Sequence, residues 1–249
     1  NLIDRAKSAN CSALVITLDL QILGQRHKDI KNQMTAPPRL TIKNMLNMAT
    51  KPHWCLGMLQ TKRHGFSNII GHATGVENLT SLSDWSAKTL MRTLNWDDLD
   101  WIIKRWGGKV ILKGIQDVED AKMAVKTGAD AIIVSNHGGR QLDGALSSIR
   151  SLPSIIDAVG DQIEVRMDGG IRSSQDVAKA VSLGAKGVMI GRPFIYGLGA
   201  MGQKGVSKAL DIIHKELDTT MALCGERNIT NMSRDNLLIP KDFRGDWEK

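Results

Sequence analysis

From residue 107 onward, short apolar segments alternate with longer amphipathic segments. The apolar segments have the length and β-branched content of buried strands, and they span residues 110–114, 131–135, 163–167 and 187–190. The amphipathic segments predict helices at residues 117–127, 145–159, 173–183 and 205–224. Pro153 predicts a break or kink within the second of these helices. Strands that alternate with helices are typical of parallel βαβ units, so the chain is predicted to be an α/β protein.

The N-terminal part adds one further unit. Residues 2–8 predict a helix, and residues 13–19 predict a strand. A long segment without clear strands then extends to about residue 95, and a helix follows at 96–106. A loop of that length is normally functional or partly disordered.

The five predicted strands fall short of the eight that close a (β/α)8 TIM barrel. Residues 120–129 and 176–185 share the pattern Asp-x3-Ala-Val-x2-Gly-Ala, which is consistent with repeated βα units, although many helix-to-strand joints look similar. We therefore expect residues 1–249 to be the C-terminal portion of one barrel domain, with its strands 4–8 and a long active-site loop at about 24–95. Three strands would then lie upstream of Asn1. The alternative is an open sheet.

The net charge of +7 is concentrated in one segment of that loop. Between residues 25 and 64 there is one acidic residue, Asp29, against eight basic residues: Arg26, Lys28, Lys31, Arg39, Lys43, Lys51, Lys62 and Arg63. The same segment holds Trp54 and four methionines, Met34, Met45, Met48 and Met58. Such a segment either rests on an anionic membrane surface or forms a solvated loop with apolar anchors. Nucleic acid is not an expected partner, because aromatic residues are only 4% of the chain.

The cysteines and the hydropathy point to a cytoplasmic protein that is peripheral on the inner membrane or soluble. Cys11, Cys55 and Cys224 are widely spaced and form no CxxC pair, which favours free thiols and argues against disulfides or a zinc site. No run of about 18 apolar residues is present to span a bilayer.

The strand at 131–135 is followed by the most informative motif of the chain. Ser135-Asn136-His137-Gly138-Gly139-Arg140 places an imidazole and a guanidinium three residues apart at a strand end, where barrels build their active sites. A histidine exchanges protons near neutral pH, and an arginine binds a carboxylate with two parallel hydrogen bonds. Together they indicate proton abstraction from a small organic acid.

Charged residues also end the first and second strands. Asp19 is either a loop acid or the partner that orients the His137 imidazole and stabilises its charged form. Lys113 ends an apolar strand, so it faces an anionic ligand or forms an interior ion pair, with Asp19 as one candidate. Arg26 is either a second carboxylate contact or part of the basic segment.

The last two strands predict a phosphate site. Gly169 and Gly170, which follow Asp168, let backbone N–H groups approach a phosphate, while Arg172 and Arg192 supply charge, the latter directly after Gly191. The following helix N-terminus would add its dipole. The alternative is a tight glycine turn with surface arginines. In TIM barrels a phosphate site is common after strands seven and eight, which supports the barrel.

These residues resemble the FMN-dependent α-hydroxy-acid oxidase and dehydrogenase family. The resemblance covers essentially the whole chain, and its most specific element is the motif 135–143, while the phosphate motif 168–172 with 191–193 is shared with other FMN barrels. The long loop with Trp54, and residues 146–148, are most similar to bacterial respiratory L-lactate dehydrogenases.

The resemblance implies a role for each candidate residue. It makes His137 the active-site base, Asp19 its partner, Arg140 the clamp on the substrate carboxylate and Arg26 a second, mobile arginine. It places Lys113 beside flavin N1, where positive charge stabilises the reduced flavin. The flavin-contacting positions would be Thr17 and Ser135, and the ribityl and phosphate site Asp168, Gly170, Arg172, Gly191 and Arg192.

The implied function is oxidation of a small L-2-hydroxy acid, foremost L-lactate to pyruvate, by FMN, with electrons passed to quinone or a cytochrome. Alternatives are a glycolate-type oxidase that uses O₂, a flavin-type diphosphate isomerase, and an inactive FMN- or phosphate-binding fragment. The resemblance also implies a homo-oligomer, commonly a tetramer. The family's first three strands, a flavin-stacking segment and two active-site tyrosines are missing, since Tyr196 matches neither position, so this chain alone should bind FMN weakly.

Overall fold

The computed structural model describes residues 2–22, 24–33, 41–62, 65–70, 72, 75–76, 81, 85 and 93–243. Met34, Arg39 and Arg63 of the basic segment lie outside these residues. The chain divides into two compact units. One comprises Asn1–Ala9 and Gln21–Thr93, and the other comprises Asn10–Leu20 and Leu94–Lys249. The single-domain assignment for residues 1–249 stays a prediction.

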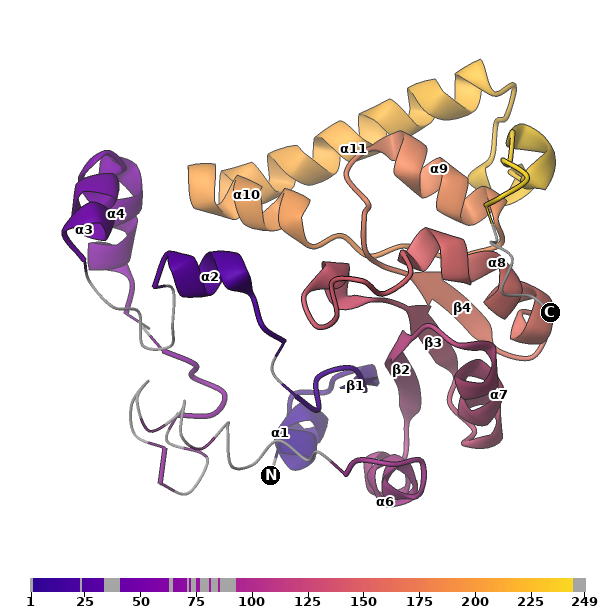
Figure 1. The fold of residues 1–249 in the computed structure, drawn as a ribbon, viewed down its shortest axis with the longest axis horizontal. Helices are drawn as coiled ribbons and strands as arrows, with labels where there is room; N and C mark the ends of the chain where they lie inside the picture. Colours follow the sequence, from indigo (N-terminus) through magenta and orange to yellow (C-terminus); the bar gives the residue numbers. More distant parts are fainter. Residues whose placement is uncertain are drawn as a thin grey trace. The chain divides into compact units, whose positions relative to one another are not determined.

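The second unit is built on a parallel four-stranded sheet with the order β1-β2-β3-β4 (Figure 1). The strands are β1 (Ala13–Thr17), β2 (Lys109–Ile115), β3 (Ala131–Val134) and β4 (Glu164–Met167). In register, Thr17 lies opposite Lys113, and Lys113 lies opposite Ile133. The carboxyl ends of the strands therefore meet at one edge of the sheet. The prediction of an α/β protein with a parallel sheet is confirmed.

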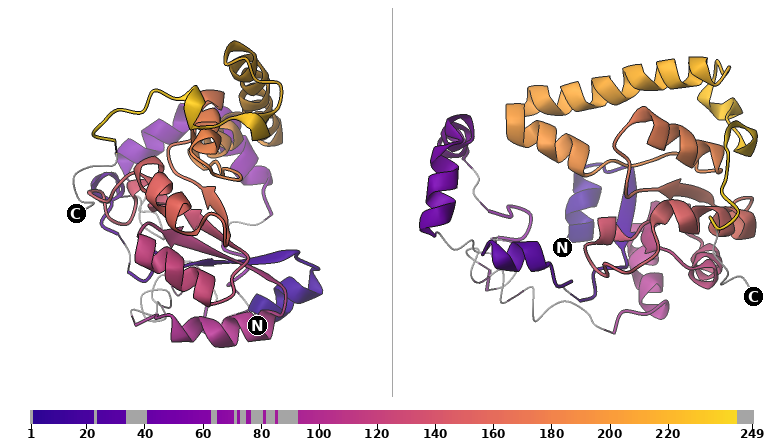
Figure 2. Two further views of the ribbon diagram at one scale, coloured as in Figure 1. Left: turned by 90° about the vertical axis from the view of Figure 1, so that its right-hand side faces the viewer. Right: turned by 45° about the horizontal axis from the view of Figure 1, so that its top comes forward.

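Helices follow the strands in the predicted alternation. They are α6 (Asp97–Trp106), α7 (Val118–Lys126), α8 (Ser148–Val159), α9 (Ser174–Ser182), α10 (Arg192–Met201) and α11 (Gln203–Leu223), with short 3-10 turns η1 (His137–Gly139), η2 (Ile229–Asn231) and η3 (Arg234–Asn236). Helices α7 and α8 lie side by side along the sheet, and α10 and α11 form a helical hairpin (Figures 1 and 2).

Local signals set the helix ends. The Asp117 carboxylate caps α7 by accepting from the N–H groups of Glu119 and Asp120 at 2.8 and 3.4 Å. Gly128 and Gly184, the equivalent glycines of the repeated pattern, both have positive φ (+76° and +111°). That conformation ends each helix and favours glycine.

The core lies between the sheet and its helices. All four residues of β3 are buried, as are Leu112 of β2 and Val165 of β4. Leu152 and Ile155 of α8 are also fully buried. Burying an aliphatic side chain of this size contributes about 1.5–3 kcal/mol. This packing gives the carboxyl edge a rigid support.

Two predicted elements differ from the structure, and one helix was not expected. The fifth strand is reduced to an isolated bridge between Met167 and Val188, although backbone hydrogen bonds from Lys186 and Met189 to β4 keep it parallel. Among the described residues it has no neighbour on its other side, which explains its weak definition. Helix α8 begins three residues later than predicted and continues through Pro153, which is buried in it. Helix α10 was not predicted.

The other unit contains α1 (Leu2–Ser8), α2 (His27–Lys31), α3 (Ile42–Ala49) and α4 (Pro52–Gln60). The described part of residues 24–95 contains no strand, and it holds α2, α3 and α4, which the sequence pattern did not predict. The Thr41 hydroxyl caps α3 by accepting from Asn44 N at 3.2 Å, and α4 starts with Pro52. Among the described residues, no helix is long and apolar enough to cross a bilayer.

Candidate active site

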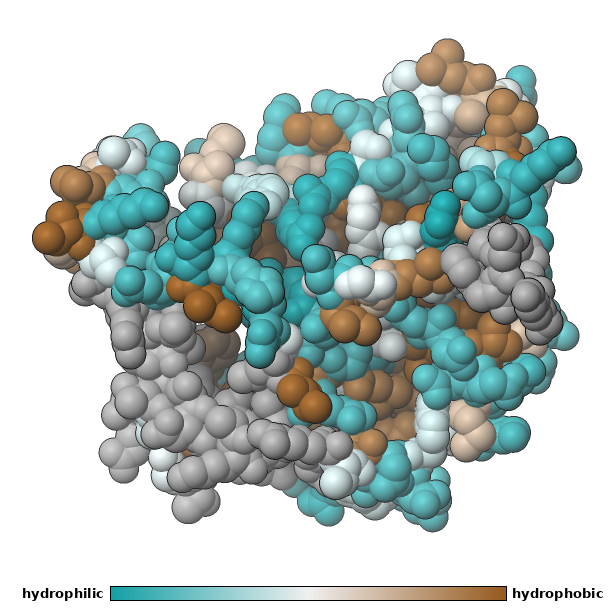
Figure 3. Space-filling model, viewed as in Figure 1, coloured by the Kyte–Doolittle hydropathy of each residue, from teal (hydrophilic) through white to brown (hydrophobic). Residues whose placement is uncertain are grey.

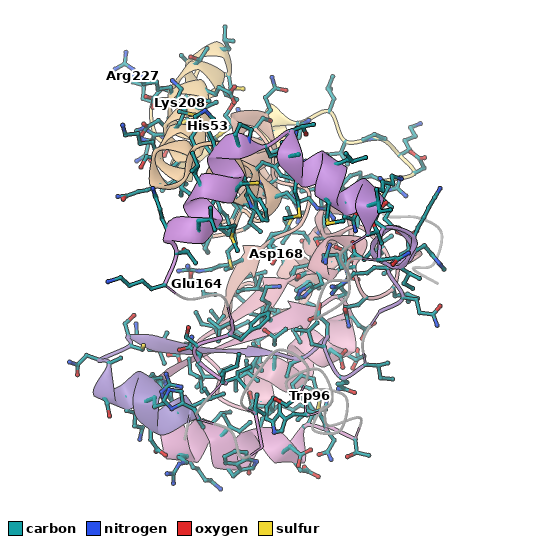
Figure 4. All side chains as sticks on the ribbon, turned by 90° about the vertical axis from the view of Figure 1, so that its left-hand side faces the viewer. His53, Trp96, Glu164, Asp168, Lys208 and Arg227 are labelled. Atoms are coloured by element: carbon teal, nitrogen blue, oxygen red, sulfur yellow. The ribbon has the colours of Figure 1, made fainter. Side chains whose placement is uncertain are left out.

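The carboxyl edge of the sheet gathers most of the predicted site residues. Asp168 follows β4 at this edge, whereas Glu164 begins the same strand at the opposite edge; both are labelled in Figure 4. Thr17 ends β1 and Asp19 follows it, and Lys113 lies near the end of β2. Because the strands are parallel, four separate segments meet at this edge.

His137 and Asp19 form a pair across the edge. The His137 Nδ1 atom lies 3.2 Å from Asp19 Oδ1, and their side chains are 27% and 16% exposed. When Nδ1–H donates to the carboxylate, Nε2 is left to accept a proton. The second Asp19 oxygen, Oδ2, is buried and has no hydrogen-bond partner in the structure.

Gly114 permits this pairing. It has a φ of +104°, and a Cβ at this position would lie 2.9 Å from Cβ and Cγ of Asp19. A side chain would therefore displace Asp19, and the backbone conformation itself favours glycine. The ladder between β2 and β3 is also irregular between Lys113 and Ile115. Gly114 was read from the sequence only as the last residue of a strand.

The turn that carries His137 is strained. His137 has a φ of +55°, and Gly138 and Gly139 follow with φ of +68° and +70°. A left-handed conformation costs a non-glycine residue about 1–2 kcal/mol. Strain of this kind is held at functional sites by the surrounding structure.

Asn136, which the sequence reasoning passed over, holds this turn. Its Oδ1 accepts from the backbone N–H groups of Gly138 and Gly139 at 2.9 and 3.2 Å, and its Nδ2 donates to Leu146 O at 3.2 Å. Its own N–H donates to the buried Ser148 hydroxyl at 3.2 Å. An Asn before paired glycines is the available signal, because Asn favours such turns.

Lys113 pairs with Asp168. Its Nζ lies 2.8 Å from Asp168 Oδ2 and donates to Ser135 Oγ at 3.0 Å, with side-chain exposures of 13% and 18% for the ion pair. The suggested ion pair of Lys113 with Asp19 is therefore wrong, because Asp19 is engaged by His137. Asp168 Oδ1 is buried and has no partner in the structure, so it offers an acceptor for a ligand hydroxyl.

The glycine-rich turn after β4 leaves space for a ligand. Gly169 and Gly170 have φ of +87° and +83°, and a Cβ on Gly170 would meet nothing within 4 Å. A Cβ on Gly169 would instead lie 2.9 Å from Ser148 Oγ, so this glycine lets the two turns pack closely. Arg192 joins them, since its Nη2 donates to Gly138 O at 3.0 Å.

The two helices after the last strands differ at their N-termini. Just before α9, the Asp176 carboxylate accepts from the N–H groups of Arg172 and Ser173 at 2.9 and 3.0 Å. The first N–H of α9 itself, that of Ser174, donates to Glu216 Oε2 at 3.4 Å. Helix α10 has no side-chain cap at Gly191. The helix dipole expected at the phosphate site is therefore better supplied by α10 than by α9.

A cleft of about 660 Å³ joins these parts, a volume typical of small-molecule sites. Its lining contains Lys113, His137, Gly138, Arg140, Asp168, Gly169, Gly170, Ile171, Arg172, Met189, Ile190, Gly191, Arg192, Ile195 and Tyr196. Ile195 and Tyr196 were missed as cleft residues because α10 was not predicted.

Not every predicted site residue lines this cleft. Thr17, Asp19 and Ser135 support it from the strand ends. Arg26 belongs to the other unit, where it is the N-cap residue of α2, and its role stays a prediction. Within the described part of the chain, no group of three or more His, Cys, Asp and Glu side chains is placed to hold a metal ion.

The parallel sheet and the cleft at its carboxyl edge, which is lined by glycine-rich turns and by histidine, lysine and arginine side chains, define the class as an α/β protein with a basic cleft. The chain belongs to the FMN-dependent dehydrogenase family, whose model matches residues 1–239. An L-lactate dehydrogenase from Caulobacter sp. (strain K31) is 43% identical over 241 residues, which cover 95% of this chain and 62% of that protein. Another from Azorhizobium caulinodans is 44% identical, with coverage of 96% and 63%.

Solved structures agree with this family. The crystal structure of monotopic membrane protein (S)-mandelate dehydrogenase has a TM-score of 0.88 at 32% identity, over 95% of this chain and 62% of that chain. A soluble mutant of the membrane-associated (S)-mandelate dehydrogenase from Pseudomonas putida gives 0.73 at 31% identity, with coverage of 95% and 60%. This chain thus spans about three fifths of the length of its relatives. The neighbours are TIM-barrel flavoenzymes, so the chain has the fold of part of such a barrel.

Proposed function

We propose that this chain carries the site for FMN-dependent oxidation of a small L-2-hydroxy acid, foremost L-lactate to pyruvate. The main support for this proposal is the arrangement of two side-chain pairs at one cleft. The His137–Asp19 pair and the Lys113–Asp168 pair lie there together with Arg140 and a glycine-rich turn. The relatives named L-lactate dehydrogenase favour lactate among the 2-hydroxy acids.

The residues present fit FMN. The open space at Gly170 and the uncapped N-terminus of α10 suit a phosphate, with Arg172 and Arg192 as counter-charges. The unpartnered Asp168 Oδ1 suits a hydroxyl of the ribityl chain. Lys113 would hold positive charge near the flavin ring. Bound there, FMN supplies an acceptor for two electrons.

The chain's own residues would then handle the substrate. Oxidation of a CH–OH group to a carbonyl removes two electrons and two protons. Arg140 would hold the substrate carboxylate with paired hydrogen bonds, and His137 Nε2 would take one of the two protons. Asp19 would keep the imidazole in the required tautomer and stabilise its charged form.

Anaerobic titration tests this proposal. The chain is mixed with excess FMN, which allows for weak binding, and its absorbance is followed as L-lactate is added without oxygen. Bleaching of the bound flavin with formation of pyruvate is the expected result. Bound flavin that stays oxidised with lactate, glycolate and mandelate would contradict the proposal and would favour an inactive FMN-binding fragment or another FMN barrel.

We further propose that the protein works at an anionic membrane surface. Its electrons would pass to quinone, or alternatively to a cytochrome, rather than to O₂. Ile42, Met45 and Leu46 of α3 are exposed and recur at helical spacing, and Leu56 and Leu59 of α4 are also exposed. Hydrophobic surface is visible over the α3–α4 hairpin in Figure 3. Ile42 is 74% exposed and Leu59 is 81% exposed. Residues 41–62 carry Lys43, Lys51 and Lys62 and no acidic residue. Apolar stripes flanked by lysines are typical of helices that lie on anionic membranes.

Flotation with lipid vesicles tests the membrane proposal. The chain should float at low salt with vesicles that contain phosphatidylglycerol and much less with phosphatidylcholine alone. Replacing Ile42 and Leu46 together by Ser should lower binding at least about tenfold, because the membrane would lose contact with two exposed apolar side chains. The matched control is Leu223→Ser on α11, where the side chain is 84% exposed. No flotation at low salt, or equal loss in the control, would contradict the proposal.

A further inference from the structure

The hydroxyl of Ser135 joins two parts of the candidate site that no sequence motif connects. Ser135 is 1% exposed at the end of β3. Its Oγ accepts from Lys113 Nζ at 3.0 Å and from the backbone N–H of His137 at 3.1 Å. A serine hydroxyl has two lone pairs, so both are used by these donors.

The two donors, the Lys113 ammonium and the His137 backbone N–H, lie in different parts of the candidate site. Lys113 lies on the cleft wall and is held on its other side by Asp168. Its ammonium has three N–H donors, so one is left for a ligand in addition to Asp168 and Ser135. The His137 N–H belongs to the strained turn, whose other two N–H groups are held by Asn136. Ser135 thus accepts hydrogen bonds both from the Lys113 ammonium and from the backbone of His137.

We propose that Ser135 is a positioning residue that couples cofactor binding to the conformation of His137. This inference rests on the proposed function, since it needs an anionic or flavin ligand at Lys113. A ligand that fixes the Lys113 ammonium also fixes the hydroxyl, and the hydroxyl restrains the left-handed His137. Rigidifying one part of a network lowers the cost of ordering the next, which makes the two sites cooperative.

Amide hydrogen exchange measured by NMR tests the inference without any turnover. In the cofactor-free chain, Ser135→Ala should speed exchange of the His137 amide about tenfold, because that N–H loses its acceptor. Exchange at Ile132 and Ile133 of β3 should stay unchanged. FMN should slow His137 exchange in the native chain and no longer do so in Ser135→Ala. FMN affinity of the variant should fall about tenfold as Lys113 loses a hydrogen bond.

Ser151→Ala is the matched control. Ser151 is 4% exposed, and its Oγ has no hydrogen-bond partner in the structure, so the change removes an equally buried hydroxyl outside the network. If Ser135→Ala does not fold, Lys113→Met approaches the same network from its other end and should also abolish the FMN-dependent slowing at His137. Native exchange at His137 in Ser135→Ala, or an equal effect of Ser151→Ala, would overturn the inference.

The readouts separate this inference from the proposed function. Loss of the exchange coupling is measured with oxidised FMN and no substrate. If the native chain binds FMN but does not oxidise lactate, the proposed function fails while the exchange test still decides the role of Ser135. If FMN does not bind at all, faster His137 exchange in the cofactor-free Ser135→Ala chain still decides whether the hydroxyl holds the turn.

Discussion

The amino and carboxyl edges of the parallel sheet, where the strands begin and end, both carry charged residues. The two edges differ in how far these residues are exposed. At the amino edge, a shallow depression is lined by Asp130, Asp161, Gln162, Glu164 and Lys186, and all five are exposed. At the carboxyl edge, Lys113, Asp168, His137 and Asp19 are largely buried and paired. Buried charges are costly unless they are paired, so a protein retains them where they have a task.

Buried acceptors separate the edges as well. The carboxyl edge contains the left-handed His137 and glycines with positive φ at 114, 138, 139, 169 and 170. Left-handed residues also precede the strands at the amino edge, where Gly128 and Gly184 end helices. The carboxyl edge, however, also holds the buried and unpartnered carboxylate oxygens of Asp19 and Asp168, and this combination points to the functional edge.

The largest expected difference between the edges is catalytic. His137→Gln should slow flavin reduction by L-lactate at least about 100-fold, because general base catalysis is lost, while FMN still binds. The control is Glu164→Gln at the amino edge, which should leave the rate within about twofold. Stopped-flow absorbance under anaerobic conditions measures both. Equal rates of flavin reduction in His137→Gln and the native chain would contradict a catalytic role for the carboxyl edge.

A smaller effect concerns stability. Gly114→Ala should lower the free energy of unfolding by about 1–3 kcal/mol, because Asp19 blocks a Cβ and φ is positive there. Gly187→Ala is the control, since its Cβ would meet nothing within 4 Å and its φ is not positive. Urea unfolding followed by circular dichroism measures the difference. A destabilisation of the same size at Gly187 would show that the carboxyl edge is not specially constrained.

The smallest effect is a pH dependence on α7. Burial raises the pKa of Asp120 above its ordinary value, and the charge of Asp117 raises it further. The folded chain therefore binds this proton more tightly than the unfolded chain does. The resulting stabilisation is present below the ordinary pKa and is lost as pH rises through the raised pKa. Asp120→Asn should thus unfold at a slightly higher temperature than the native chain at pH 7, and this gain should shrink near pH 3. A variant less stable at pH 7 would contradict the sign.

Much of the fold could be predicted because its signals are local. The Asp117 cap and the glycines at 128 and 184 lie next to the helices that they delimit. The site residues could be placed because parallel strands align their carboxyl ends, so polar residues after separate strands must meet.

The rest depends on contacts between distant residues. Whether Lys113 pairs with Asp168 or Asp19 depends on contacts across strands, since Asp19 lies beside Gly114 and pairs with His137, while Lys113 pairs with Asp168. Helix α10 contains Gly197 and Gly199, which disfavour a helix in isolation. It is stabilised by close packing on α11, where Gly197 and Gly205 approach backbone to backbone. No pattern within α10 reports that contact.

Hydrogen exchange with and without FMN, read by mass spectrometry, tests the central claim most directly. The account predicts slower exchange in residues 135–143, 168–172 and 189–196 when FMN is added, with residues 160–164 at the amino edge unchanged. Protection at the amino edge, or no protection at the carboxyl edge at saturating FMN, would contradict it.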